Sequence, residues 1–210
     1  MIYAIVQFLS KMFFRIGFGQ KVYGLEHIPR EGAFLLAANH ASHFDPPAIG
    51  CPLPRHICYF ARKTLFKGFF AWVLPRLKTI PVDRDGDSDV SALKRVFKEL
   101  NNGEALILFP EGTRTEDGNL QPAKRGVGMI ACRTQVPVVP VRIYGSFEAL
   151  SRFDKRPNFG KKITVVYGSP LDSEIYDPGK EAGKERYQIA SERIMEAITA
   201  LENPRAASFN

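Results

Sequence analysis

The sequence has no uninterrupted apolar run of about 18 residues, which is the length that a membrane-spanning helix requires. Its first residues also lack the positively charged start and the small-residue cleavage site of a secretory signal peptide. We therefore expect no clear transmembrane helix. The protein is expected to be cytosolic or attached to a membrane from its cytosolic face, as a peripheral or monotopic protein.

Cysteine is scarce, and the three cysteines have neither CxxC nor zinc-ligand spacing: Cys51, Cys58 and Cys132. The absence of both spacings predicts free thiols in a reducing compartment. The sequence also lacks a long lysine and arginine tract and any zinc-finger, RNP or basic-zipper pattern. A nucleic-acid partner is therefore disfavoured, although the net charge is +7 and the pI about 9.4. That charge favours an anionic partner such as a phosphorylated metabolite or an anionic membrane.

Strand-like and helix-like segments alternate along the 210 residues, which predicts one α/β domain with a mixed, largely parallel sheet flanked by helices. Short apolar runs are the expected strands, at 21–28, 33–38, 56–60, 80–84, 105–109, 136–144 and 162–167. Amphipathic segments are the expected helices, at 88–101, 126–135 and 181–202.

The N-terminal segment 2–17 has an apolar stripe at helical spacing and basic residues on another face. Two interpretations remain open: a helix docked on the protein's own core, and a helix lying in a membrane interface. Four phenylalanines around much of the helix favour lipid: Phe8, Phe13, Phe14 and Phe18. We accordingly divide the chain into an N-terminal amphipathic membrane-interface helix, 1–20, and one larger domain, 21–210.

A second aromatic-rich segment, 65–77, is too short to span a bilayer and carries cations at its margins. It is equally consistent with a buried core helix and with a second patch that faces a membrane.

The strand at 33–38 leads directly into a polar cluster, in which His40 and Asp45 are five positions apart. On an ideal helix these side chains would lie about 140° apart, so they would not share a face. The spacing suits a histidine in a strand-to-helix turn and an aspartate in the first helical turn, where Pro46 is tolerated. The carboxylate would then hold one imidazole nitrogen and leave the other as a base.

Taken alone, a His–Asp pair is more often a helix cap or a surface ion pair. A metal site formed with His43 is chemically conceivable, but no further histidine or cysteine has suitable spacing. Ser42 lacks the flanking glycines of a nucleophile elbow, so it is expected to cap the helix or brace the loop.

A second polar cluster follows the strand at 105–109. Gly112 permits a tight turn, Arg114 can grip a phosphate through paired donors, and Glu111 could orient a hydroxyl or hold the arginine. A simple turn with a Glu–Arg pair is the alternative. Further cations near strand ends could contribute to a phosphate site: Lys63, Arg84 and Lys124.

Four motifs occur in order: N-H-x-S-x-x-D at 39–45, I-P-V-D-R at 80–84, F-P-E-G-T-R at 109–114 and V-P-V-V-P-V at 136–141. Together they resemble the glycerolipid acyltransferase family, of the 1-acyl-sn-glycerol-3-phosphate acyltransferase type. The resemblance covers roughly residues 22 to 170 and implies that 21–210 is the acyltransferase domain. One departure is Lys78, where that pattern has glycine.

The resemblance implies that His40 is the general base and that Asp45 orients it. It also implies that the glycerol phosphate of the acceptor is bound by Arg84, Glu111, Gly112, Thr113 and Arg114. Possible supporting residues of this site are Asn39, Ser42, Lys63 and Lys124.

The implied reaction transfers an acyl group from acyl-CoA or acyl carrier protein to 1-acyl-glycerol-3-phosphate. The product is phosphatidic acid, a phospholipid precursor. An activated thioester needs a base but no covalent intermediate, so the resemblance implies neither a metal nor a bound cofactor. Expected partners are membrane lipids, bound peripherally, and the acyl donor. Two alternatives remain: another lysolipid or glycerol phosphate as the acceptor, and a non-enzymatic lipid-binding protein.

Overall fold

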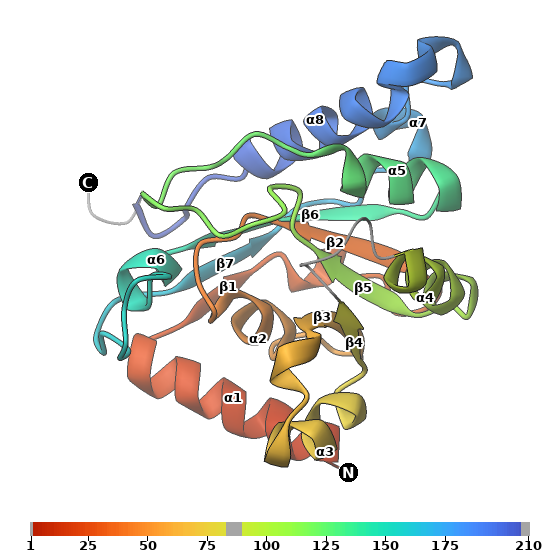
Figure 1. Cartoon of the computed structure of the whole chain (residues 1–210). Helices are drawn as coiled ribbons and strands as arrows, with labels where there is room; N and C mark the ends of the chain where they lie inside the picture. The colour runs from red at the N-terminus through yellow and green to blue at the C-terminus, as the bar shows by residue number, and fades with distance from the viewer. Residues whose placement is uncertain (1, 83–89, 207–210) are drawn as a thin grey trace.

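A twisted seven-stranded sheet forms the centre of the molecule in a computed structural model that describes residues 2–82 and 90–206 (Figure 1). The strand order is β1-β7-β6-β2-β5-β3-β4. The strands are β1 (Lys21–Tyr23), β2 (Phe34–Ala38), β3 (Ile57–Arg62), β4 (Thr79–Val82), β5 (Ala105–Leu108), β6 (Val138–Tyr144) and β7 (Thr164–Tyr167). Every neighbouring pair is parallel except β6 and β7. The predicted mixed, largely parallel sheet is confirmed.

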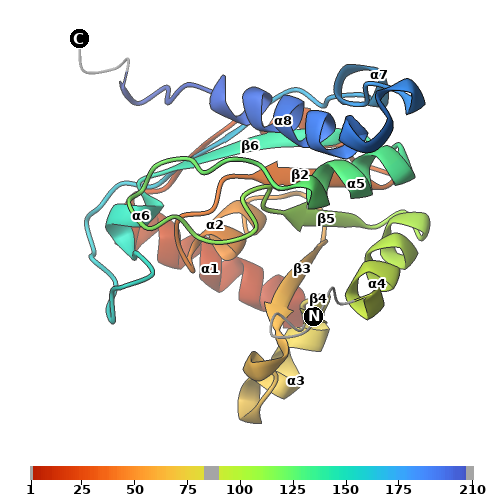
Figure 2. The same cartoon turned by 45° about the horizontal axis from the view of Figure 1, so that its top comes forward.

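Helices cover both faces of the sheet (Figures 1 and 2). On one face lie α1 (Ile2–Phe18) and α2 (Asp45–Gly50), and on the other lie α4 (Val90–Asn101), α5 (Arg125–Thr134) and α8 (Arg186–Thr199). Alternate residues of the central strands supply the two cores, because successive side chains of a strand point to opposite faces. Leu36 and Ile107 therefore join the core beneath α1 and α2, while Leu35 and Leu106 join the core beneath α5 and α8.

The remaining elements are short. They are α3 (Gly68–Arg76), α6 (Ser146–Ala149), α7 (Ser173–Tyr176) and the 3-10 turns η1 (Leu25–His27), η2 (Lys63–Leu65) and η3 (Lys180–Glu185).

Strand β2 is central and pairs in parallel with both β5 and β6, and all five of its residues are buried. Its register places Ala37 opposite Leu108 and Ala38 opposite Val141. The carboxyl ends of β2 and β5 therefore meet at one edge of the sheet, which is where parallel α/β folds position their ligands. The polar segments after these two strands therefore lie together at that edge.

Helix α1 has apolar residues on more than one side: it is docked on the protein's own core, and its membrane-interface role stays a prediction. Tyr3, Phe14 and Phe18 are buried against the protein. A second set of large apolar side chains is exposed: Ile5, Phe8, Leu9, Met12, Phe13 and Ile16. Within the described ranges no helix is both long enough and apolar enough to cross a membrane.

Helix α3 lies at the edge of the molecule beside β4 rather than in the core (Figure 1). Phe69 is 71% exposed, Phe70 57% and Trp72 50%, whereas Val73 is buried. The core-helix interpretation of 65–77 is therefore wrong, and the segment is an exposed apolar patch.

The departure from the family pattern at Lys78 coincides with a left-handed backbone, with φ 53°. Glycine adopts this conformation without a steric penalty, whereas residues with a side chain rarely do. In this protein Lys78 adopts the conformation, and its Nζ forms an ion pair with Oε1 of Glu104 at 2.5 Å. The three cysteines are buried free thiols, as predicted.

Candidate active site

The predicted pairing of His40 with Asp45 is present in the structure. Asp45 is the first residue of α2 and is fully buried. Its Oδ2 accepts hydrogen bonds from Nδ1 of His40 at 2.8 Å and from the backbone N–H groups of Ala41 at 2.6 Å and Ser42 at 2.7 Å. These three donors fix the carboxylate at the start of the helix, with the histidine in the preceding turn.

The His40 ring is held on a second side by Phe109, which stacks on it with a centroid distance of 3.9 Å and an interplanar angle of 17°. Since Asp45 accepts from Nδ1, the neutral tautomer carries its proton there and leaves the Nε2 lone pair available. His40 lines a pocket, so a substrate hydroxyl can approach the ring. An oriented, neutral imidazole of this kind can act as a general base.

Two predicted supporting residues brace the turn. The Asn39 amide exchanges two hydrogen bonds with the backbone of Ile143, at 3.0 and 2.8 Å, and so extends the pairing with β6 beyond the end of β2. The Ser42 hydroxyl donates to the Leu150 carbonyl at 2.6 Å and accepts from the Phe44 N–H at 3.0 Å. Ser42 thus braces the loop, as expected.

His43 also lines the pocket, and burial, followed by the positive charge of Arg114, lowers its pKa. A cluster of three or more potential metal ligands is absent from residues 2–82 and 90–206.

Glu111 contacts the turn that holds His40 directly. It is 1% exposed, and its Oε1 accepts a hydrogen bond from the backbone N–H of His40 at 3.0 Å. Burial raises the pKa of Glu111 to about 7, although hydrogen bonds from the backbone N–H groups of His40 and Gln121 oppose that shift. The Thr115 N–H donates to the His40 carbonyl at 2.9 Å, so the segment after β5 holds the His40 backbone at both ends of the residue.

The rest of the second motif lies beside this contact. Gly112 has φ 69°, and a Cβ there would lie 3.1 Å from Cδ of Lys124, so the glycine brings Lys124 against the loop. Thr113 is exposed, and Arg114 is partly buried and lines the same pocket as His40. Lys63 is exposed on η2.

Arg84 falls outside the described ranges, so its predicted role stays a prediction.

The pocket itself has a volume of about 820 Å³. It runs among α1, α2, β3 and α3 and also reaches His40, His43, Arg114 and Arg152. Its apolar lining includes Tyr3, Val6, Phe70, Leu74 and Leu77. A polar end with two imidazoles and two guanidinium groups is thus continuous with an apolar cavity.

Two neighbours of the site were not predicted from the sequence, Thr115 and Arg152. Thr115 acts through its backbone, so its side chain gives no signal. Arg152 lies 38 positions from Arg114 and reaches its carbonyl with Nη1 at 3.4 Å. No motif spacing connects two residues that distant.

Comparison with known proteins identifies the family. The family model described as acyltransferase matches residues 19–144, which include the His40 turn and the segment after β5. The chain belongs to the acyltransferase family.

Relatives of this acyltransferase share a narrower description. This chain is 33% identical over 189 residues to a 1-acyl-sn-glycerol-3-phosphate acyltransferase of Bacillus subtilis. The match covers 88% of this chain and 89% of that one. A chloroplastic enzyme of the same description from Brassica napus is 32% identical over 128 residues, and the match covers 60% of this chain and 37% of that one.

A solved structure is also similar. The crystal structure of the 1-acyl-sn-glycerophosphate acyltransferase of Thermotoga maritima superposes with a TM-score of 0.73 at 27% identity. The match covers 96% of this chain and 81% of that one.

Proposed function

We propose that this acyltransferase moves a fatty acyl group from an acyl thioester to the free sn-2 hydroxyl of 1-acyl-sn-glycerol-3-phosphate, which yields phosphatidic acid. The observation that carries this proposal is a single pocket that joins the His40–Asp45 pair and Arg114 to an apolar cavity. The descriptions of its relatives agree with this acceptor.

In the proposed reaction, Nε2 of His40 removes the proton of the acceptor hydroxyl as the oxygen attacks the thioester carbonyl carbon. The tetrahedral intermediate then collapses, the carbon–sulfur bond breaks, and the departing thiolate takes the proton from the imidazolium. Asp45 orients the ring and stabilises that imidazolium, with its Oδ2 held by two backbone N–H groups. A positioned general base of this type contributes about 10²–10⁴-fold in rate.

Arg114 is the proposed phosphate ligand, because a guanidinium can donate two parallel hydrogen bonds to phosphate oxygens. Gly112 lets the backbone turn close to Lys124, which adds a second cation. Thr113 and Arg84 complete the proposed set. Glu111 has a different proposed role, because a carboxylate repels phosphate and its Oε1 already faces the His40 N–H. It positions the base.

The apolar part of the pocket is the proposed acyl-chain site. The whole pocket, at about 820 Å³, lies in the range of about 300–1,000 Å³ typical of small-molecule sites. The lining side chains of α1, of α3 and of the residue after α3 carry no formal charge: Tyr3, Val6, Gln7, Ser10, Phe70, Leu74 and Leu77. An acyl chain placed there would have its thioester carbon near His40.

Peripheral attachment to a membrane is part of the proposal. Helices α1 and α3 lie at the same end of the molecule (Figure 1), each carries exposed apolar side chains, and both also line the pocket. A lipid substrate could then enter from the bilayer. Because Phe14 and Phe18 belong to the core, deleting α1 would disrupt the fold. Serine in place of Phe8 and Ile16, which are 60% and 76% exposed, is the appropriate test of vesicle binding.

An acceptor panel tests the proposed activity. Purified protein is assayed for thioester release with acyl-CoA and with acyl carrier protein. The acceptors are 1-acyl-sn-glycerol-3-phosphate, glycerol 3-phosphate and a lysophospholipid that lacks a phosphomonoester. We expect turnover to require both the acyl chain and the phosphomonoester. Faster turnover with either of the other acceptors would contradict the assignment.

A further inference from the structure

The segment 151–162, which follows α6 and leads to β7, combines exposed aromatic rings with exposed cations. We call it the basic loop. Phe153 is 67% exposed and Phe159 61%. Its lysines and arginines are exposed as well, namely Arg152, Lys155, Arg156, Lys161 and Lys162, and its sequence contains a single acidic residue, Asp154. The four motifs that define the active site do not include this segment.

The basic loop is attached to the C-terminal end of α1. Phe159 stacks on Phe18, with ring centroids 5.4 Å apart and an interplanar angle of 26°. The backbone N–H of Gly160 donates to the Gly17 carbonyl at 3.0 Å, and that of Ile163 donates to the Phe18 carbonyl at 3.1 Å. The loop is therefore held beside the C-terminal end of α1, as Figures 1 and 2 show.

Most of the loop's positive charge is not neutralised within the protein. Arg152 pairs with Glu116 at 2.9 Å. Lys155, Arg156, Lys161 and Lys162 form no ion pair with a carboxylate in the described part of the chain. Asp154 accepts the Ser151 N–H at 2.8 Å. Four such cations and one carboxylate leave a local charge of +3 beside an exposed apolar helix face.

We propose that the basic loop is a second membrane contact, which binds the anionic headgroups of phospholipids and inserts Phe153 into the interface. This inference rests on the proposed placement of α1 at a membrane and adds the lipid class that the protein selects. Lysine and arginine can keep their charges at headgroup level while aromatic rings occupy the layer beneath. An acidic surface on a partner protein would complement the positive charge of the basic loop, but it would not account for the exposed ring of Phe153.

The position of the loop links lipid binding to catalysis. Arg152, at its start, lines the same pocket as His40 and Arg114. An anionic lysophospholipid held at the loop is therefore next to the site where its hydroxyl reacts. Attraction of anionic lipid at this point raises the local substrate concentration.

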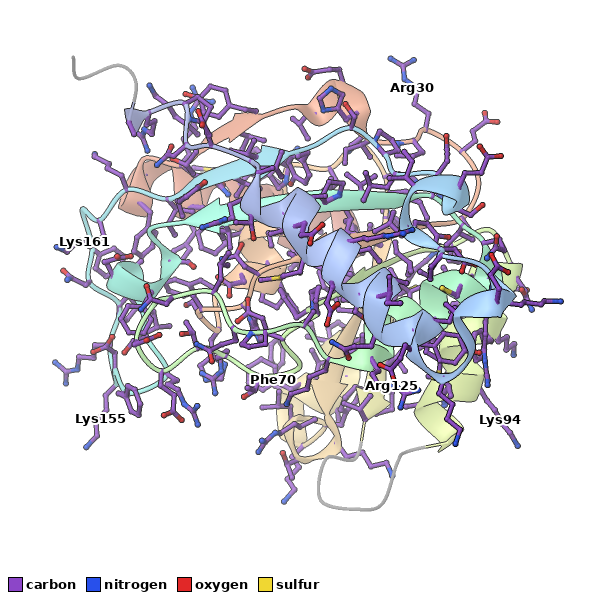
Figure 3. The ribbon with its side chains drawn as sticks, turned by 90° about the horizontal axis from the view of Figure 1, so that it is seen from above. Arg30, Phe70, Lys94, Arg125, Lys155 and Lys161 are labelled. Atoms are coloured by element: carbon purple, nitrogen blue, oxygen red, sulfur yellow. The ribbon has the colours of Figure 1, made fainter. Side chains whose placement is uncertain are left out.

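The test compares two triple variants in co-sedimentation with vesicles. The loop variant is Lys155→Gln/Arg156→Gln/Lys161→Gln, and the matched control is Lys94→Gln/Arg95→Gln/Lys98→Gln on α4. Figure 3 shows that Lys94 lies far from Lys155 and Lys161. The vesicles contain phosphatidylcholine alone or mixed with phosphatidylglycerol. The substituted side chains lie at the surface, so the variants should fold, which circular dichroism checks.

We expect affinity for the mixed vesicles to fall about fivefold for each cation removed, and on the order of 100-fold in the loop variant. Binding to phosphatidylcholine should not change, and the control should bind both vesicles like wild type. The Phe153→Ser variant should bind both kinds of vesicle more weakly. Equal weakening by the loop and control variants, or full binding by the loop variant, would overturn the proposal.

An activity measurement separates this inference from the proposed reaction. With a short-chain lysophosphatidic acid and acyl-CoA below their micelle concentrations, the loop variant should match wild type, because no vesicle is involved. If the variant instead keeps vesicle binding and loses only transfer from acyl carrier protein, the loop is a protein-docking surface and the membrane proposal is wrong.

Discussion

The Glu111 carboxylate accepts a hydrogen bond from the backbone N–H of His40 at 3.0 Å, although the two residues are 71 positions apart. The backbone N–H of Thr115 donates a hydrogen bond to the His40 carbonyl at 2.9 Å. The two polar segments that follow β2 and β5 are thus one unit, in which the second segment fixes the backbone of the first. In this arrangement the position of His40, the proposed base, depends on Glu111.

Replacement of Glu111 by glutamine should leave kcat/KM within about tenfold of wild type, because the amide oxygen can still accept the His40 N–H. Alanine at the same position should lower kcat by about 100-fold, which is the scale of a 1 Å misplacement. Steady-state kinetics on both variants check this. If glutamine is as damaging as alanine and acts mainly on KM, then Glu111 contacts the substrate instead.

The same carboxyl should make stability depend on pH. Its folded pKa of about 7 lies above the ordinary value of 4.5, so the folded state binds more protons between these values. The free energy of unfolding should therefore fall as pH rises from about 4.5 to 7. Denaturant titrations of wild type and Glu111→Gln across this window measure the effect. The free energy of unfolding of the glutamine variant should fall less over this window than that of wild type. If the two proteins show parallel pH profiles, Glu111 is not the source of the pH dependence.

If the acyl chain occupies the proposed apolar site, narrowing that site should change the preferred length of the acyl-CoA donor. Leu74 lines the pocket from α3, and Leu74→Trp should fill part of the cavity. We expect kcat/KM to fall for long acyl-CoA donors and to be maintained for short ones. Phe69→Trp is the control, since Phe69 is 71% exposed on the same helix and is not a pocket residue. A uniform loss over all chain lengths would place the acyl chain elsewhere.

Close packing of Gly50 against Tyr59 predicts a stability difference between two glycines. A Cβ at Gly50 would lie 1.8 Å from the Tyr59 hydroxyl oxygen, so Gly50→Ala should destabilise the protein by about 1–3 kcal/mol. At Gly126, in the first turn of α5, a Cβ meets nothing within 4 Å. Gly126→Ala should be neutral or stabilising by up to about 1 kcal/mol. Urea unfolding measures both, and equal effects would refute the packing argument.

Local sequence features were sufficient to predict the first half of the site. An apolar run, a polar turn and Asp45-Pro46 fix a strand, a turn and a helix start, and these place Asp45 beside His40. The alternation of strands and helices predicted a largely parallel sheet, and the structure adds that β2 and β5 are neighbours within it.

Features that depend on long-range packing could not be predicted. The sequence of α3 fits a core helix equally well, and only its position outside β4 leaves Phe69 and Trp72 exposed. The contacts of Glu111 with His40 and of Arg152 with the pocket depend on strand register and loop paths, which carry no local signal. The family resemblance implied that Glu111 binds the acceptor phosphate, which stays a prediction; the structure shows its buried carboxylate accepting the His40 N–H.

The most direct test of the proposed mechanism is the rate of acyl transfer to 1-acyl-sn-glycerol-3-phosphate by wild type and by His40→Ala, measured as thiol release from acyl-CoA. With folding verified by circular dichroism, we predict that wild type forms phosphatidic acid. The variant should lose at least about 10²–10⁴-fold in kcat. A folded His40→Ala variant that transfers the acyl group at the wild-type rate would contradict the proposed base.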